Sequence, residues 1–247
     1  MSAATIEAPP LRRVQWLPAW RIVPTRYPSV FLFDRIADAD DFDALYALEA
    51  MTNDRIRDET GLIELVPREQ RVFGPGSGPI MAAFTHLNPS GSRFSDGSYG
   101  VFYAARERAT AVAETCFHHG RFLAATAEGP MHLPMRLYRV DIDARLHDLR
   151  KRPADVDTAV HDPDSYVAAQ ALARTLRQAG SAGVVYRSVR HAGGQCAGLF
   201  TPKAASNCLH AAYLLYAWDG TRFADVYEKL EPPGYDAEQA VPGGRTR

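Results

Sequence analysis

Hydrophobic positions change their period between residues 99 and 117, and this change is the clearest structural signal in the chain. Residues 99–105 are aromatic and β-branched, as in a buried strand, with Val101 and Tyr103 on one face and Phe102 on the other. From Arg106 the apolar side chains follow a helical stripe that includes Val112, Cys116 and Phe117. Glu114 lies about 60° outside Phe117 at roughly 100° per residue. We therefore expect a strand followed by a helix, with a carboxylate at the border of the buried helix face.

Comparable patterns predict the other elements. A helix is expected at 38–60, where apolar residues recur at near-helical intervals behind several aspartates, and another at 164–179, closed by Gly180. Residues 67–98 carry prolines and glycines that are typical of loops. So many strands with few helices favour a mixed α+β fold with mostly antiparallel pairing over a regular βαβ array. The expected strands are 135–142, 183–189, 196–201, 207–217 and 221–229.

The organisation is expected to be a single domain, because no repeat, low-complexity run or long linker divides the sequence. A chain of 247 residues with 46% hydrophobic content is long enough to bury a sizeable core. We expect a flexible segment at 1–18, a compact domain at 19–231 with a helical insertion around 38–60, and a flexible tail at 232–247.

Charge and cysteine content argue against several classes of protein. With 28 basic and 29 acidic side chains, the formal charge is -1, so no global field attracts nucleic acid or an anionic membrane. The three cysteines, Cys116, Cys196 and Cys208, form no CxxC pair, which argues against a disulfide framework and a cysteine-rich zinc site. Without a signal sequence or a membrane-spanning stretch, the expected location is the cytoplasm.

Side chains that can carry chemistry concentrate between Arg93 and Glu114. This segment passes from a Gly-bearing loop with an arginine, through a strand with an inward Tyr103, to a helix with a border carboxylate. A guanidinium forks two hydrogen bonds onto phosphate oxygens, so Arg93 is a candidate phosphate clamp. Ser188 is a further candidate, on one face of a predicted strand with Tyr186.

Each of these residues also has an ordinary structural interpretation. Arg93 can be a surface arginine paired with Asp96, and Tyr103 can be a core aromatic. Glu114 can be a solvated helical carboxylate, and Ser188 can be a core hydroxyl with a satisfied hydrogen bond.

Other motifs do not support a competing chemistry. His118 and His119 are adjacent, so they point about 100° apart on a helix, and no HExxH motif accompanies them. The sequence contains neither GxGxxG, nor GxxxxGK[ST], nor GxSxG. A His and a Cys occur in the glycine loop 191–196, but that spacing matches no established catalytic arrangement, so it is interpreted as a strand connection bordering a pocket.

The segment GSRFSDGSYGVFYAARERATAVAE at 91–114 resembles the core of the RES domain, a family named for an Arg, a Glu and a Ser. The family pattern has an arginine in a Gly-rich turn, here Arg93, a tyrosine ten residues later, here Tyr103, and a glutamate eleven residues further, here Glu114. The serine best matches Ser188, and an early Trp-Arg-Ile strand matches around Arg21. The similarity covers roughly residues 19–203.

Two departures from the family pattern indicate a subfamily with an added helical insertion. The stretch between Arg21 and Arg93 is much longer than in compact members. The turn reads SRF where many members have GRW.

The resemblance implies a fold related to ADP-ribosyltransferases and NAD as the substrate. No metal is expected, because the spacing of the His and Cys residues does not match that of zinc ligands. It implies a toxin that depletes NAD by phosphorolysis or hydrolysis of the nicotinamide–ribose bond and is restrained by an Xre-type antitoxin. In this scheme Glu114 stabilises an oxocarbenium-like ribose, and Arg93, together with Arg21, clamps the pyrophosphate. Tyr103 stacks on nicotinamide, and Ser188 hydrogen-bonds within the same pocket.

Alternative functions stay open on the sequence alone. The chain can transfer ADP-ribose to a protein, or act without catalysis as the partner of an antitoxin. A homodimer and a hetero-oligomer of toxin and antitoxin are both compatible with the sequence. The 38–60 insertion is a candidate partner surface or lid, with a plain structural helix as the alternative.

Overall fold

The computed structural model describes residues 8–27, 32–49, 60–151 and 154–230. Within them, seven strands form one mostly antiparallel sheet in the order β1-β2-β5-β4-β3-β6-β7. The strands are β1 (Leu11–Pro24), β2 (Phe102–Ala105), β3 (Met131–Asp148), β4 (Gly183–Arg187), β5 (Gln195–Leu199), β6 (Ala205–Trp218) and β7 (Phe223–Lys229). The predicted mixed α+β class is therefore confirmed.

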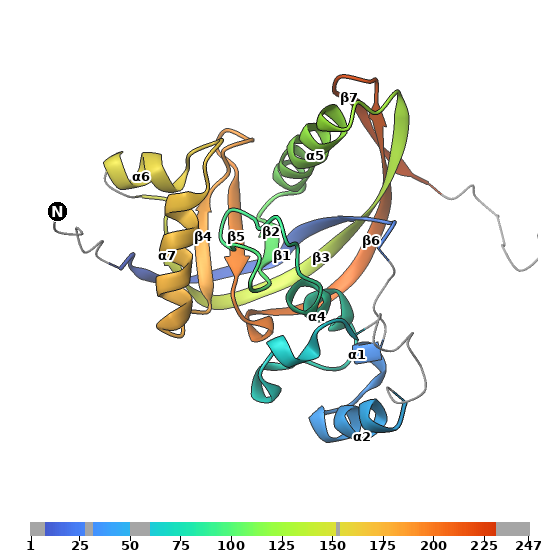
Figure 1. The fold of residues 1–247 in the computed structure, drawn as a ribbon, viewed down its shortest axis with the longest axis vertical. Coiled ribbons are helices and arrows are strands. Elements are labelled where there is room, and N and C mark those ends of the chain that lie inside the picture. Colours follow the sequence, from blue (N-terminus) through green and yellow to red (C-terminus); the bar gives the residue numbers. More distant parts are fainter. Residues whose placement is uncertain (1–7, 28–31, 50–59, 152–153, 231–247) are drawn as a thin grey trace, which may run out of the picture.

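Helices flank this sheet. The α-helices are α1 (Leu32–Arg35), α2 (Ala39–Glu49), α4 (Gly78–Thr85), α5 (Arg108–Ala125), α6 (Ala154–Val160) and α7 (Val167–Gln178), with short 3-10 helices at Ile63–Leu65, Arg68–Gln70 and Pro202–Ala204. Figure 1 shows α7 beside β4, with α6 next to α7. It shows α5 near β7, and α1, α2 and α4 grouped at the opposite end of the molecule. None of the helices in the described ranges has the length and apolar character needed to cross a bilayer.

The sheet closes on itself through β1. This strand pairs with β2 and also runs antiparallel along β3, so β1, β2, β5, β4 and β3 form a closed circuit, from which β6 and β7 extend. The pairing of β3 with β4 is parallel and short. Closure satisfies the backbone hydrogen bonds of strands that would otherwise end the sheet.

Apolar side chains pack on both faces of the sheet, as the alternation along β2 predicts. Phe102 is fully buried in one cluster, while Tyr103 packs against the other. The cluster around Tyr103 contains residues from β4, β5, α5 and α7, including Tyr186, Cys196 and Ala111. This second cluster underlies the candidate site.

The structure corrects several element boundaries. Residues 11–18 belong to β1, and residues 11–16 pair with β3, so this part of the segment expected to be flexible is ordered strand. The predicted 38–60 helix is α2, which ends at Glu49; residues 50–59 lie outside the described residues, as does the predicted tail at 232–247. The region 67–98 contains α4, which the prolines obscured because Pro79 stands near its N-terminus, where proline is compatible with a helix. The helix predicted at 164–179 is confirmed as α7, with Gly180 at φ +76 after its end.

Candidate active site

Strand register brings Glu114 and Ser188 to the same end of the sheet. β2 and β4 both pair antiparallel with β5, so they run in the same direction. At this end Ala105 and Tyr186 both face Cys196 as register partners on β5. The chain leaves β2 into α5, which carries Glu114, and leaves β4 directly into Ser188. Two segments that are distant in sequence therefore meet at the same end of the sheet.

The carboxylate of Glu114 accepts a short hydrogen bond from Ser188. The distance from Ser188 Oγ to Glu114 Oε1 is 2.6 Å across 74 positions of sequence. The same oxygen lies 3.9 Å from the thiol sulfur of Cys196, and Oε2 lies 3.8 Å from Nε2 of His118. The Glu114 side chain is 19% exposed. The side chain is thus largely enclosed and keeps some access to solvent, in agreement with its predicted place at the border of the helix stripe.

Ser188 is held so that its hydroxyl hydrogen points to Glu114. Its Oγ accepts hydrogen bonds from the backbone N–H groups of Arg190, at 3.1 Å, and His191, at 2.9 Å. With both acceptor positions used, the O–H is left to donate to the carboxylate. Ser188 is therefore a residue that orients Glu114, as well as a nearly buried hydroxyl at 9% exposure.

The loop after Ser188 is fastened to α5. His191 Nδ1 lies 2.8 Å from the hydroxyl of Thr110, a fully buried residue in the first turn of that helix. Gly194 closes the loop where a Cβ would stand 2.6 Å from Thr110 Oγ1, so any larger residue would push the loop away from the helix. The loop predicted as a pocket border thus lies directly beside the Glu114 helix.

Arg93 is buried and holds the segment between α6 and α7. Its Nη1 donates to the carbonyls of Val160, at 3.0 Å, and Asp162, at 2.9 Å, and its guanidinium lies 4.6 Å from the ring centre of Tyr166. The alternative of a surface pair with Asp96 is wrong, because Asp96 pairs with Arg174 and Arg93 is 8% exposed.

The loop that carries Arg93 depends on glycine and on Tyr103. Gly91 and Gly97 have φ angles of +72 and +97, and a Cβ at either position would meet a backbone oxygen closer than 3 Å. The Tyr103 hydroxyl accepts the N–H of Phe94 at 2.9 Å and lies 2.8 Å from Ser92 Oγ, so it bonds to both neighbours of Arg93. Burial raises the pKa of Tyr103 well above its usual range.

Arg21 does not join this group. Its Nη1 donates to the Tyr103 carbonyl at 2.9 Å, while its guanidinium lies 4.5 Å from the ring centre of Phe102, which packs on the opposite face of the sheet from the Tyr103 side chain. Burial lowers the pKa of Arg21. The structure therefore joins Glu114 to Ser188 and Tyr103 to the Arg93 loop, and the charges of Glu114 and Arg93 both act on Cys196. The Arg21 guanidinium lies elsewhere, over Phe102.

Two titratable side chains beside Glu114, those of His118 and Cys196, are uncharged at pH 7. Burial, followed by the charges of Arg190 and Arg93, lowers the pKa of His118 to about 4, so this histidine is neutral at pH 7. Burial and the Glu114 carboxylate raise the pKa of Cys196, which keeps the thiol protonated. In the described part of the chain no group of three or more His, Cys, Asp or Glu side chains is arranged to hold a metal ion.

Sequence reasoning missed Arg190 and His161. Arg190 lies 3.3 Å from the ring centre of Phe117 and donates to the carbonyl of Pro163. His161 is 9% exposed and lies in sequence between Val160 and Asp162, whose carbonyls bind Arg93. Its Nδ1 lies 3.0 Å from Asp157 Oδ1. The only sequence signal for Arg190 is its place two residues after Ser188. For His161 the signal is the spacing of four residues from Asp157, whereas its contact with the Arg187 N–H depends on another element.

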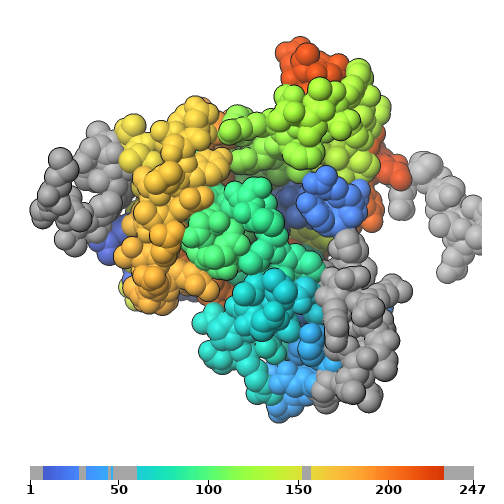
Figure 2. Space-filling view, in the orientation of Figure 1, coloured from blue at the N-terminus to red at the C-terminus, as the bar shows by residue number. Residues whose placement is uncertain are grey.

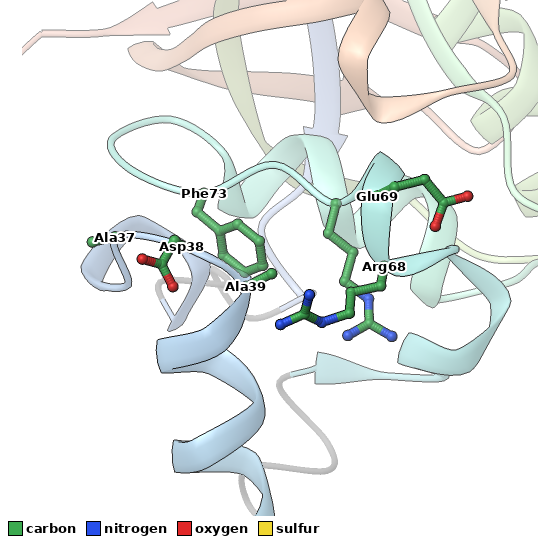
Figure 3. A pocket seen from close by; sticks show the side chains of 7 residues that line it. Ala37, Asp38, Ala39, Arg68, Glu69 and Phe73 are labelled. Atoms are coloured by element: carbon green, nitrogen blue, oxygen red, sulfur yellow. The ribbon is translucent and has the colours of Figure 1, made fainter.

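The elements that carry the candidate site share one face of the molecule. In Figure 2 the surfaces of α7, α5 and the loop before β2 adjoin on the face turned to the viewer. An open cavity of about 500 Å³ lies at a different place, beside α1 and α2, and Figure 3 shows Arg68, Phe73 and Asp38 around it. Its arginines are already paired, Arg68 with Asp40 and Asp43, and Arg71 with Asp43, so the cavity offers little free charge for an anion.

This chain is similar to known proteins in its sequence and in its structure. A protein of Sinorhizobium fredii (strain NBRC 101917 / NGR234) named "Uncharacterized protein y4oC" is 29% identical over 227 residues, which covers 91% of this chain and 93% of that protein. One chain in the crystal structure of the M. tuberculosis MbcT–MbcA toxin–antitoxin complex is similar with a TM-score of 0.44 and 10% identity, over 89% of this chain and 86% of that chain.

A family model adds the decisive match. The model of the RES domain matches residues 68–219, which include Arg93, Tyr103, Glu114 and Ser188 and leave Arg21 outside. Because this match spans more than half of the sequence, the chain belongs to the RES domain family.

Proposed function

We propose that this protein cleaves the bond between nicotinamide and ribose in NAD, with Glu114 as the catalytic carboxylate. The observation that carries the proposal is the 2.6 Å hydrogen bond from Ser188 to Glu114, in a largely enclosed place beside the buried Arg93. Membership of the RES family supports NAD as the substrate, through the resemblance of residues 91–114.

The chemistry needs an oriented negative charge. When the C–N bond breaks, its electron pair leaves with the nicotinamide ring, which changes from a cation to a neutral molecule, and positive charge develops on the ribose. A carboxylate fixed beside that carbon stabilises this charge without reorganising at the moment of reaction. The Ser188 hydroxyl and the Cys196 thiol donate to Glu114 Oε1, which leaves Oε2, 3.8 Å from His118 Nε2, as the oxygen that we assign to the ribose.

Capture of the ribosyl cation completes the reaction. A phosphate oxygen forms the new bond in phosphorolysis and gives ADP-ribose 1″-phosphate; in hydrolysis a water oxygen forms it and loses a proton. Both routes release one nicotinamide for each NAD. Arg93 contributes positive charge for a phosphate group of the substrate, and Tyr103 keeps the Arg93 loop in place while its ring remains a candidate stacking surface for nicotinamide.

The test is nicotinamide release by purified protein with NAD, in the presence and absence of inorganic phosphate. Glu114→Gln keeps the size of the side chain and removes the charge, so we expect a folded protein slower by about 10²- to 10³-fold. Glu128→Gln is the matched control, because it makes the same change at an exposed carboxylate. Full turnover by Glu114→Gln would make the assignment wrong.

The products of the same assay separate the alternatives. A ribosyl phosphate indicates phosphorolysis, and free ADP-ribose indicates hydrolysis. Labelled ADP-ribose that stays on a protein would instead favour protein ADP-ribosylation. No nicotinamide release under any condition would favour a binding role without catalysis.

We extend the proposal to a toxin restrained by an Xre-type antitoxin, as the RES resemblance implies. Expression of the chain alone should then lower cellular NAD and arrest growth, and Glu114→Gln should do neither. Co-expression of the candidate antitoxin should restore NAD levels, and the antitoxin should copurify with the chain. Constant NAD levels together with a stable antitoxin complex would favour the non-catalytic interpretation.

A further inference from the structure

Arg190 lies beside the candidate site with its charge uncompensated. The residue follows Ser188 by two positions, and its backbone N–H donates to Ser188 Oγ. Its guanidinium lies over the Phe117 ring, one helical turn after Glu114, and its Nη2 donates to the Pro163 carbonyl. Its Nε is buried with no hydrogen-bond partner among the described residues. A buried guanidinium nitrogen without an acceptor is costly, so the protein leaves this side chain incompletely satisfied.

Arg93 and Arg190 together make this region positive. Within the described ranges neither guanidinium forms an ion pair with a carboxylate; their oxygen partners are the backbone carbonyls of Val160, Asp162 and Pro163. Both charges reach His118 and contribute to its low pKa, so both lie near the helix turn that carries Glu114. The two guanidiniums are anchored to one short segment, residues 160–163, which fixes them relative to each other.

We infer that Arg190 forms, with Arg93, a binding site for a phosphate group at the mouth of the Glu114 site; this inference rests on the proposed function. A guanidinium carries a forked set of donors that matches phosphate oxygens, and stacking on Phe117 presents it as a flat, oriented group. The site takes a phosphate group from one of two sources: the pyrophosphate of NAD, or the free phosphate that accepts the ribosyl group.

The experiment compares the wild type with Arg190→Gln and with Arg121→Gln. Arg121 is an exposed arginine on α5, the helix that carries Glu114 and Phe117. The control therefore removes one nearby positive charge and leaves the contacts of Arg190 with Phe117 and Pro163 intact. The KM for NAD is measured at saturating phosphate, and the KM for phosphate at saturating NAD. Loss of a charge-assisted hydrogen bond in Arg190→Gln should raise one of these constants about 10- to 100-fold, and Arg121→Gln should leave both within about twofold of the wild type.

The two sources give different outcomes. A raised KM for NAD, with no such increase for nicotinamide riboside as the substrate, assigns the site to the NAD pyrophosphate. A raised KM for phosphate alone assigns it to the acceptor. Both constants unchanged in Arg190→Gln would overturn the inference and leave the proposed function standing, provided that nicotinamide release still depends on Glu114.

A binding measurement decides the inference without turnover. Calorimetric titration with inorganic pyrophosphate should show binding to the wild type that Arg190→Gln weakens about 10-fold or more, and equal binding by both would overturn it. If Arg190→Gln does not fold, as circular dichroism would show, Phe117→Leu replaces it, because it removes the stacking surface and keeps the guanidinium. If the wild type releases no nicotinamide, the proposed function fails and the titration alone judges the phosphate site.

Discussion

The hydroxyl of Ser188 donates to Glu114 Oε1 at 2.6 Å while accepting two backbone N–H groups, so one small side chain fixes both the loop after β4 and the carboxylate on α5. The direction of the hydrogen bond follows from this arrangement, because both acceptor positions of the hydroxyl are already used. The orientation of Glu114 is therefore coupled to the conformation of the loop that also carries Arg190.

Ser188→Ala should reduce both activity and stability. The Glu114 carboxylate loses its short hydrogen bond, and the N–H groups of Arg190 and His191 lose their acceptor. We expect nicotinamide release to fall about 10-fold or more and the free energy of unfolding to fall by about 1–3 kcal/mol. Ser206→Ala, at an exposed position on β6, is the control and should change neither quantity. Unchanged turnover in Ser188→Ala would show that Glu114 does not depend on this hydroxyl.

Tyr103→Phe separates two roles of the tyrosine. The substitution keeps the ring, as nicotinamide stacking would require, and removes the hydroxyl that bonds to Ser92 and Phe94. If the hydroxyl holds the Arg93 loop, the free energy of unfolding should fall by about 1–3 kcal/mol and the KM for NAD should rise. Urea titration and steady-state kinetics measure the two effects. A variant with wild-type stability and KM would leave stacking as the sole role.

Arg93→Lys should loosen the segment between α6 and α7. A lysine keeps the charge and cannot reproduce the planar contact with Tyr166 together with both carbonyl hydrogen bonds. We expect faster amide hydrogen exchange in residues 157–166 and a raised KM for NAD. Arg174→Lys alters an exposed arginine paired with Asp96, where the expected cost is about 0–1 kcal/mol, and exchange in this segment should stay unchanged. Unaltered amide exchange in Arg93→Lys would show that Arg93 does not hold the segment between α6 and α7.

Stability should fall as the pH is lowered from about 6.5, the ordinary pKa of histidine. Burial is the main cause that lowers the pKa of His161, although Asp157 opposes it, so the folded state binds the proton less readily than the unfolded state. The neutral ring keeps Nε2 as the acceptor for the Arg187 N–H at 3.4 Å. The contribution of His161 is thus fully present above pH 6.5 and decreases as the pH falls toward its folded-state pKa.

Urea titrations at pH 7 and pH 5 test this linkage. His161→Gln should reduce the difference in unfolding free energy between the two pH values, because it removes a group that takes up a proton on unfolding. The exposed His132 is the control position, and His132→Gln should leave that difference unchanged. An equal pH dependence in wild type and His161→Gln would exclude His161 as a contributor.

Local patterns were enough to predict the strand, the helix and the glycine loop around the site. The period of apolar residues identifies β2 and α5, and it also places Glu114 at the border of the buried helix face, because both features depend on residues close in sequence. The same reasoning failed for α4, whose Pro79 reads as a loop residue out of context, and for residues 11–16, whose strand state depends on pairing with β3 more than a hundred residues away.

The sequence by itself determined the mixed α+β class, the family through the spacing of Arg93, Tyr103 and Glu114, and the candidacy of Ser188. Only the tertiary structure decided that Ser188 donates to Glu114, that the Arg21 guanidinium lies over Phe102, and that Arg190 stands beside the site. The physical reason is that spacing along one element specifies a face, whereas contacts between elements depend on strand register and on sheet closure, which no local pattern encodes.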